Sequence, residues 1–162
     1  MTVDDRLRQL GFGLPDALRT PTGAAYPFAW ARVRGDRVYL SGHLPLRLDG
    51  SLADPFGKVG GEVTLEQGVT AARLAALAAV GSLRRELGDL DRVVAWLRVL
   101  AMVNTAPGFT QLAAVVNGFS ATILEVFGPE VGMHSRSAVG VAELPYGVPV
   151  EIEAELEIAR TP

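Results

Sequence analysis

The sequence contains no cysteine among its 162 residues. That absence excludes disulfide bonds, thiolate metal sites and cysteine nucleophiles. Histidine is scarce too, because only His43 and His134 are present, and their separation fits no metal-ligand spacing. We therefore expect a structural or weakly functional role for each histidine and predict no metal site. Nucleophile-elbow, P-loop and dinucleotide-binding glycine motifs are also missing.

A strong net charge is absent as well. The formal charge at pH 7 is −3, and no basic stripe stands out, so we do not expect a nucleic-acid partner. The first six residues carry two acids, Asp4 and Asp5, where a signal peptide would have bases followed by an apolar run. The long apolar runs Leu74–Val80 and Val93–Val103 are too short or too interrupted by arginine to cross a bilayer. These observations predict a soluble, cytoplasmic protein without a membrane partner.

Length and composition favour one packed domain. Apolar residues make up 49% of the chain, enough for a substantial core and unlike a disordered sequence. We divide the chain after residue 27, into an N-terminal extension (1–27) and a main domain (28–162). Within the extension, Val3–Leu10 is predicted to be a short helix and Pro15–Pro27 to be irregular.

Hydrophobic periodicity predicts the elements of the main domain. In chain order they are a hairpin over Phe28–Val33 and Arg37–Ser41, a helix from Thr64 to Gly88, a central strand within Leu90–Val103, a helix from about Pro107 to Gly128–Pro129, and two strands within His134–Glu157. The central strand is apolar throughout, so we expect both of its faces to be covered. The order β-β-α-β-α-β-β predicts an α+β fold with two helices on one face of a single sheet.

Details of the two helices and of the loop before them add further expectations. Thr64 and Gln67 fit a capping box at the start of the first helix. Its arginines, which fall off the apolar stripe, are expected to lie on a solvated face; they are Arg73, Arg84 and Arg85. The long polar and glycine-rich segment 46–62 is either a functional rim or lid, or a simple surface excursion.

The last strand alternates strictly between apolar residues and glutamates. Its acidic face is expected to meet water or neighbouring subunits, where Arg98 or Arg32 could pair with the acids; the acids are Glu151, Glu153, Glu155 and Glu157. In the strand before it, Arg136 stands over a row of small residues, which leaves room for a carboxylate to approach. A salt bridge between Arg136 and a nearby glutamate is the alternative interpretation.

Three separated pieces of this sequence resemble the RidA family of imine and enamine deaminases, also called YjgF-like or endoribonuclease L-PSP proteins. They are Arg136-Ser137, Leu144-Pro145 and Val150-Glu151-Ile152-Glu153-Ala154, and the segment Tyr39 to Pro45 is similar to the family's strand-ending Ser-Gly-X-X-Pro motif. The resemblance implies a chorismate-mutase-like fold, a homotrimer with pockets between subunits, and chemistry without a cofactor.

The resemblance also implies roles for individual residues. Arg136 would bind the carboxylate of a 2-imino or enamine acid, and Glu151 would orient or activate the attacking water. The remaining pocket residues carried over are Phe28, Ser41, Gly42, Asn117 and Ala138.

Several positions depart from the family pattern. Ala138 replaces a frequent cysteine, Gly140 a common acid and His134 a usual proline, while Phe28 lacks the hydroxyl of the family's tyrosine. A hydrolase of reactive imines is therefore our first hypothesis. A non-catalytic ligand-binding or chaperone-like trimer is the second, and an endoribonuclease or translation inhibitor, disfavoured by the acidic charge balance, is the third.

Overall fold

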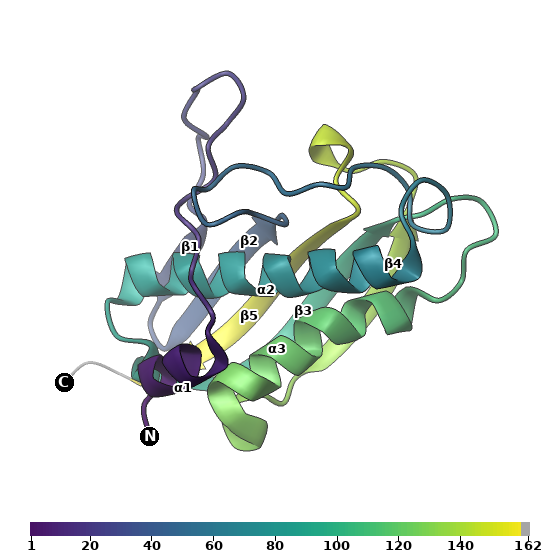
Figure 1. The fold of residues 1–162 in the computed structure, drawn as a ribbon. Coiled ribbons are helices and arrows are strands. Elements are labelled where there is room, and N and C mark those ends of the chain that lie inside the picture. Colours follow the sequence, from purple (N-terminus) through teal and green to yellow (C-terminus); the bar gives the residue numbers. More distant parts are fainter. Residues whose placement is uncertain (160–162) are drawn as a thin grey trace.

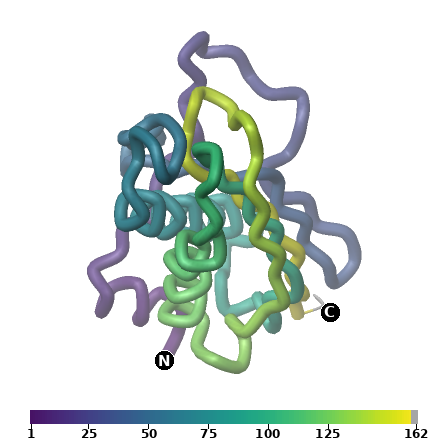
Figure 2. The backbone as a smooth tube through the Cα atoms, turned by 90° about the vertical axis from the view of Figure 1, so that its right-hand side faces the viewer, coloured from purple at the N-terminus to yellow at the C-terminus, as the bar shows by residue number. Residues whose placement is uncertain are grey.

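The computed structural model describes residues 1–159, which form one mixed five-stranded sheet with helices on one of its faces (Figures 1 and 2). The strand order is β1-β2-β5-β3-β4, and only β3 and β4 run parallel. The elements are α1 (Val3–Leu10), β1 (Ala31–Arg34), β2 (Arg37–His43), α2 (Leu65–Leu87), η1 (Leu90–Arg92), β3 (Val93–Asn104), α3 (Leu112–Gly132), β4 (Ser135–Val141), η2 (Pro145–Gly147) and β5 (Val150–Ile158). The predicted α+β fold is confirmed.

The two long helices lie side by side over the sheet. The predicted capping box at the start of α2 forms, with Thr64 accepting from Gln67 N and Gln67 accepting from Thr64 N. The helices approach so closely that a Cβ on Gly118 of α3 would overlap the carbonyl oxygen of Val69 on α2. Glycine and the many alanines of α2 therefore permit a tight helix pair.

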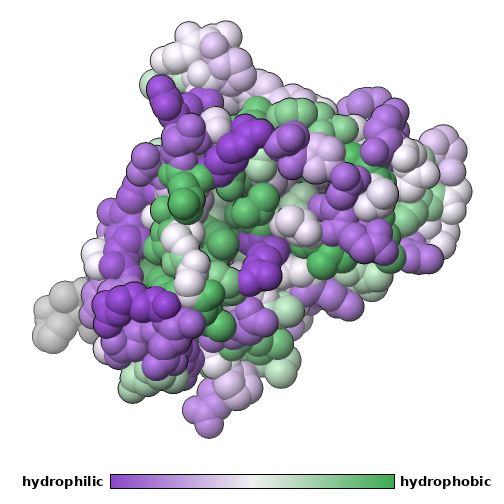
Figure 3. Space-filling model, in the orientation of Figure 1, coloured by the Kyte–Doolittle hydropathy of each residue, from purple (hydrophilic) through white to green (hydrophobic). Residues whose placement is uncertain are grey.

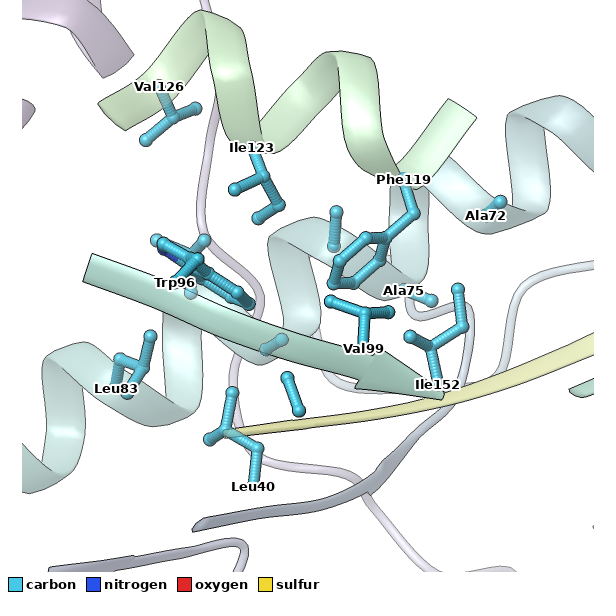
Figure 4. Packing of buried hydrophobic residues seen from close by; sticks show 14 of the residues in the cluster. Leu40, Ala72, Ala75, Leu83, Trp96, Val99, Phe119, Ile123, Val126 and Ile152 are labelled. Atoms are coloured by element: carbon cyan, nitrogen blue, oxygen red, sulfur yellow. The ribbon is translucent and has the colours of Figure 1, made fainter. Parts of the chain in front are cut away.

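The core is an aromatic and aliphatic layer between the helices and the sheet (Figure 4). The fully buried Trp96 of β3 meets Phe119 and Phe127 of α3 edge-on, with ring centroids 5.9 and 5.5 Å apart. Edge-to-face pairs of this kind add roughly 0.5–1.5 kcal/mol beyond the burial of their area. The sheet is thus a rigid platform for the side chains that project from it.

One face of β3 is open within a single chain, which corrects the expectation that both faces are covered. Trp96, Val99 and Ala101 are buried beneath the helices, whereas Val94 and Arg98 are exposed on the other side. The run is apolar on both faces, but the helices supply cover for only one. The other face is therefore partly exposed to solvent in the single chain.

Helix α3 differs from its prediction at its start, because it begins at Leu112, beyond Pro107. The regular helix is interrupted where predicted, at the non-helical Gly128 (φ 82°, ψ 168°), and a short further helical piece runs to Gly132. By length and composition alone, α3 could also cross a membrane, a feature that was not recognised from the sequence. Half of that apolar stretch is buried against the sheet and α2, as in the core helix of a soluble domain.

The arginines of α2 are not simply solvated, as was expected; they hold the N-terminal extension. Arg84 forms an ion pair with Asp4, and Arg85 donates to the Pro15 carbonyl (2.9 Å). Arg73 lies 4.4 Å from the centroid of the Phe12 ring. These contacts lay the extension along the helices.

The 46–62 segment packs across the end of the sheet (Figure 1). Val59 is fully buried, and its N–H donates to the Asn104 carbonyl at 2.8 Å. The ammonium of Lys58 donates to the side-chain oxygen of Asn104 at 2.9 Å. The segment is therefore anchored to β3 through Asn104.

Candidate functional site

Arg136 extends from β4 beneath helix α3. Its guanidinium donates to the Asn117 amide oxygen (2.7 Å), the Ser120 hydroxyl (2.9 Å) and the Ala113 carbonyl (3.2 Å). Among residues 1–159 no carboxylate lies within ion-pairing distance of it. All of its partners are neutral, so the positive charge is oriented without being neutralised.

The small residues beside Arg136 face the same helix. Ala138 is half-buried against the core, and a Cβ on Gly140 would lie 3.0 Å from the Thr105 hydroxyl and 3.6 Å from Leu112. The predicted row of one arginine over small side chains is therefore present. Asn117, the predicted helix contribution, lies directly on the guanidinium.

A histidine and a serine support Arg136, and neither was predicted to lie there. His134 Nδ1 is 2.7 Å from the Gly132 carbonyl, and its Nε2 is 2.9 Å from the Ser120 hydroxyl. A carbonyl only accepts, so Nδ1 donates and neutral Nε2 accepts the Ser120 proton, which leaves the Ser120 oxygen to accept from Arg136. Burial lowers the pKa of His134. The hydrogen bond to the Gly132 carbonyl acts in the opposite direction, and the positive charge of Arg136 lowers the pKa further.

The contacts of His134 and Ser120 with Arg136 could not be predicted from the sequence, because they form only when α3 and β4 are aligned in the fold. The clue was present, since His134 and Arg136 share one side of the predicted strand and Ser120 lies one helical turn after Asn117. Only the fold brings these two rows together.

Glu151 lies on β5 beside Gly42. A Cβ on Gly42 would overlap Glu151 Oε1 and lie 2.7 Å from its carboxyl carbon, so glycine provides the space in which this carboxyl rests. Burial first, and the charge of Glu153 second, raise the pKa of Glu151. The carboxyl is thereby suited to exchanging protons nearer neutral pH than an exposed glutamate.

A cavity of about 370 Å³, which we name the aromatic cleft, opens beside Glu151. Gly42 and Glu151 line it together with the rings of Tyr26, Phe28, Trp30 and Tyr146. The hydroxyls of Tyr26 and Tyr146 are hydrogen-bonded to each other, and this bond raises the pKa of Tyr26. Phe28, one of the pocket residues that the resemblance implies, is on the wall of this cleft.

Ser41 does not line the aromatic cleft. Its hydroxyl donates to the Ala29 carbonyl at 2.8 Å and so holds the chain that leads into β1. It borders a second cavity of about 540 Å³ on the open face of the sheet, together with Arg98 and Glu153. The register places Arg98 opposite Glu155, yet no ion pair joins them within residues 1–159.

The predicted site residues therefore form two groups. Arg136 and Ala138 lie under α3, which contributes Asn117, whereas Glu151 and Gly42, with Phe28, lie at the aromatic cleft. Strand β3 relates the groups: Val99 pairs with Arg136, and Met102 pairs with Glu151. Val99 and Met102 point to opposite faces, so a single chain cannot bring Arg136 and Glu151 together.

His43 belongs to neither group. It is buried, with Nδ1 2.6 Å from the Ser41 carbonyl and Nε2 2.8 Å from the Ser82 hydroxyl, and burial lowers its pKa to about 4. Its contacts fit the structural role expected from the sequence. Residues 1–159 contain no cluster of three potential metal ligands among His, Asp and Glu.

Comparisons with known proteins place this arrangement in a family. A family model described as "YjgF/chorismate mutase-like, putative endoribonuclease" matches residues 4–149. Protein TCP17 of Trypanosoma cruzi is 40% identical over 156 residues, covering 96% of this chain and 94% of the relative.

Two crystal structures share the fold closely. Atu1372 of Agrobacterium tumefaciens, a protein of unknown function, has a TM-score of 0.85 at 33% identity, covering 98% of this chain and 94% of its own. A protein from Shewanella oneidensis, described as a "putative endoribonuclease", has a TM-score of 0.88 at 27% identity, covering 98% of this chain and 100% of its own.

Proposed function

This chain belongs to the YjgF/chorismate mutase-like family, and we propose that it is a RidA-like, cofactor-independent hydrolase of reactive 2-imino or enamine acids and related small carboxylates. The observation that carries the proposal is the state of Arg136, whose guanidinium is held by neutral acceptors and by no carboxylate of the described residues. An anionic substrate is bound best by a positive charge that is held in a fixed orientation and is not already paired with an acid.

Arg136 binds the substrate carboxylate in this proposal. Asn117, Ser120 and the Ala113 carbonyl use part of the N–H donors of the guanidinium and fix its plane. These bonds use both N–H groups of Nη2 and one of Nη1, so the Nε–H and the second Nη1–H are left to donate to a carboxylate. Holding the substrate in this way places its C=N bond at a fixed position and reduces the entropy lost on reaching the transition state.

Glu151 moves the protons. Water adds to the carbon of the protonated imine while the Glu151 carboxylate accepts the water proton, giving a carbinolamine. Glu151 then returns this proton to the nitrogen, and the carbinolamine hydroxyl gives its proton to the carboxylate as the C–N bond breaks, which releases ammonia and the 2-keto acid. The raised pKa of Glu151 favours a group that both accepts and returns a proton.

The site in this proposal is shared between copies of the chain. Arg136 and Glu151 face opposite ways in one chain, so Arg136 of one copy would act with Glu151 of another. The homotrimer that the family resemblance implies supplies such a neighbour. The open face of β3, with exposed Val94 and half-exposed Met102, offers surface for the contact.

The test measures ammonia release from 2-iminopropanoate generated in place by an amino-acid oxidase. We expect Arg136→Ala to lose about 100-fold or more of kcat/KM while light scattering shows an unchanged oligomer, because the carboxylate loses its charged hydrogen-bond donor. Arg136→Lys, which keeps the charge without the fork, should recover only part of the activity.

Three outcomes would reject this activity. Equal rates for the wild type and Arg136→Ala would show that the arginine has no part in turnover. Calorimetric binding of 2-keto acids without turnover would identify the non-catalytic ligand-binding alternative. RNA cleavage that persists through purification and depends on neither Arg136 nor Glu151 would identify a ribonuclease instead.

A further inference from the structure

The aromatic cleft has one wall made of three rings in a row. Tyr26, Phe28 and Trp30 alternate along the segment before β1, and their ring centroids are 5.1 Å (Tyr26 to Phe28), 4.9 Å (Phe28 to Trp30) and 5.5 Å (Tyr26 to Trp30) apart. Trp30 is in turn fixed against the buried His43 ring at 5.6 Å. The row is therefore anchored at its inner end and presents ring surface to the cavity.

The opposite wall is a turn that holds a fourth ring in place. Tyr146 has φ 59°, the one positive φ among the described non-glycine residues. A left-handed tyrosine is strained by roughly 1 kcal/mol or more and persists only where its surroundings require it. Its hydroxyl bonds to that of Tyr26, so the two walls are joined across the cleft.

Both walls belong to segments that project at one end of the molecule. The segment before β1 and the η2 turn both project beyond the same end of the sheet in Figure 1, and the space-filling view in Figure 3 shows the first of them extending clear of the body. The cleft therefore lies at the surface, since Phe28 and Tyr146, which line it, are 48% and 45% exposed.

The carboxyl of Glu151 is the reactive group that lines the cleft. Glu151 is the only acid among the lining residues, which include no lysine, arginine or histidine, and Gly42 beside it leaves the carboxyl accessible. A volume of about 370 Å³ is in the range of small-ligand pockets. A methyl side chain on the substrate would leave most of that space unfilled. A negatively charged side chain would meet no cation among the lining residues, and a positively charged one would meet only Glu151.

We infer that the aromatic cleft receives the side chain of the substrate, and that this side chain is an aromatic ring. The inference rests on the proposed function, because it assigns a substrate class to the same site. Rings lining the cleft can stack edge-to-face or offset against an incoming ring, which an aliphatic chain of equal size cannot match. The preferred substrates are then 2-imino acids of the kind derived from aromatic amino acids, with the carboxylate on Arg136 and the C=N bond beside Glu151.

The test uses stable keto-acid analogues in calorimetric titrations of the full-length protein. We expect phenylpyruvate to bind at least about tenfold more tightly than pyruvate, and 4-methyl-2-oxopentanoate to fall between them, since a filled apolar pocket discriminates by this order. Trp30→Ala and Tyr146→Ala should each reduce the phenylpyruvate-to-pyruvate ratio several-fold. Leu48→Ala, which removes an exposed apolar side chain outside the cleft, is the matched control and should leave the ratio unchanged.

Failure of this inference and failure of the proposed function give different results. If no keto acid binds in a manner that Arg136→Ala abolishes, the proposed function itself fails. If pyruvate and phenylpyruvate bind equally well through Arg136, or the ratio is unaffected in both cleft variants, the cleft does not select the side chain. Equal binding of phenylpyruvate and 4-methyl-2-oxopentanoate would overturn the aromatic preference. Tyr146 is 45% exposed, so its variant should fold even if Trp30→Ala does not.

Discussion

Arg136 and Glu151 project from opposite faces of the same sheet. Strand β3 lies between their strands, and it pairs Val99 with Arg136 on one side and Met102 with Glu151 on the other. Residues directly opposite each other in a sheet share a face, and Val99 and Met102 alternate. The guanidinium is consequently under α3, whereas the carboxyl is beside Gly42. Their cooperation requires two copies of the chain.

Inactive variants should therefore restore each other's activity. Arg136→Ala and Glu151→Gln should each be inactive alone, but co-refolding them at equal amounts should place an intact Arg136 next to an intact Glu151 in some shared sites. Random assembly gives about a quarter of the wild-type activity in a closed ring. The measurement is ammonia release per chain after refolding, with each variant refolded alone as the control.

Absence of recovery in mixtures that demonstrably contain both chains would mean that the two residues do not share a site between copies. Mass spectrometry of the intact assemblies, with one variant carrying a mass tag, establishes whether mixing occurred.

Gly42→Ala should reduce turnover while leaving the fold stable. A Cβ at this position would overlap Glu151 Oε1, and the flexible carboxyl can swing away at little cost in free energy. We expect kcat to fall about tenfold or more, because a misplaced proton-transfer group loses its alignment, with unfolding free energy changed by less than about 1 kcal/mol. Gly61→Ala is the matched control, since its Cβ would make only ordinary contacts at 3.4 Å. A fully active Gly42→Ala would argue against a role for the Glu151 carboxyl at its observed position.

Much of this arrangement could be predicted from local patterns. Strict alternation gave the correct buried face of β5, and the Thr64 capping box gave the start of α2, because both signals lie within one element. The relation between Arg136 and Glu151 could not be predicted in the same way. It depends on the register of β3 with two different strands, which no single segment of sequence encodes.

The aromatic cleft escaped prediction for a related reason. Its rings come from a proline- and glycine-containing lead-in and from a turn with a left-handed tyrosine, neither of which has a regular period. The contacts of Arg73, Arg84 and Arg85 were missed because the N-terminal extension that covers them is remote in sequence. Tertiary packing decided both outcomes.

Ser120→Ala should weaken substrate binding without changing the chemical step. The substitution removes one acceptor from Arg136 and leaves His134 Nε2 without its donor. Loss of one hydrogen bond of roughly 1 kcal/mol predicts an increase in KM of about fivefold with kcat nearly unchanged. Steady-state kinetics with a purified imine-generating system separates the two constants.

Ser82→Ala provides a control with the same chemistry elsewhere. Ser82 bridges His43 and Arg85 as Ser120 bridges His134 and Arg136, but it touches none of the groups that hold Arg136. Its loss should cost roughly 1–3 kcal/mol of stability because a buried nitrogen of His43 is left unpaired, and KM should stay at the wild-type value. If both serine variants change KM alike, the effect on KM is a general consequence of destabilisation.

Stability should decline as the pH falls from about 6.5 toward 4, because of His43. Burial lowers the pKa of His43 to about 4, whereas an unfolded histidine titrates near 6.5. Below pH 6.5 the unfolded chain takes up a proton that the folded chain excludes, so the free energy of unfolding decreases until the folded state is also protonated near pH 4. Between pH 7.5 and pH 5 the loss is about 2 kcal/mol.

Urea denaturation across this range measures the decline, and His43→Gln should flatten it even though the variant is less stable throughout. The chain has two histidines, so an NMR titration should show two ring signals, one of which remains neutral to about pH 4. His134→Gln identifies that signal by leaving it in place. A His43 signal titrating near 6.5 would contradict the buried, neutral ring.

Leu7→Ala tests whether the N-terminal extension folds as part of the main domain. Our division of the chain after residue 27 treats residues 1–27 as an addition, yet Leu7 is 5% exposed and belongs to the common core cluster. Helix α1 is further joined to the domain by the Val3 N–H, which donates to the Asp91 carboxylate at 2.8 Å. Truncating a buried leucine costs about 2–4 kcal/mol when it packs against a cooperative core.

We therefore expect Leu7→Ala to lower the urea midpoint of the whole chain in a single transition, and Leu10→Ala, at a 38% exposed position in the same helix, to change stability by less than about 0.5 kcal/mol. A midpoint that Leu7→Ala leaves unchanged would show that α1 unfolds independently, and the boundary after residue 27 would then mark a true structural division. A shift of the full transition would instead move the start of the cooperative domain to α1, because only a helix that unfolds together with α2, α3 and the sheet can transmit its lost packing energy to them.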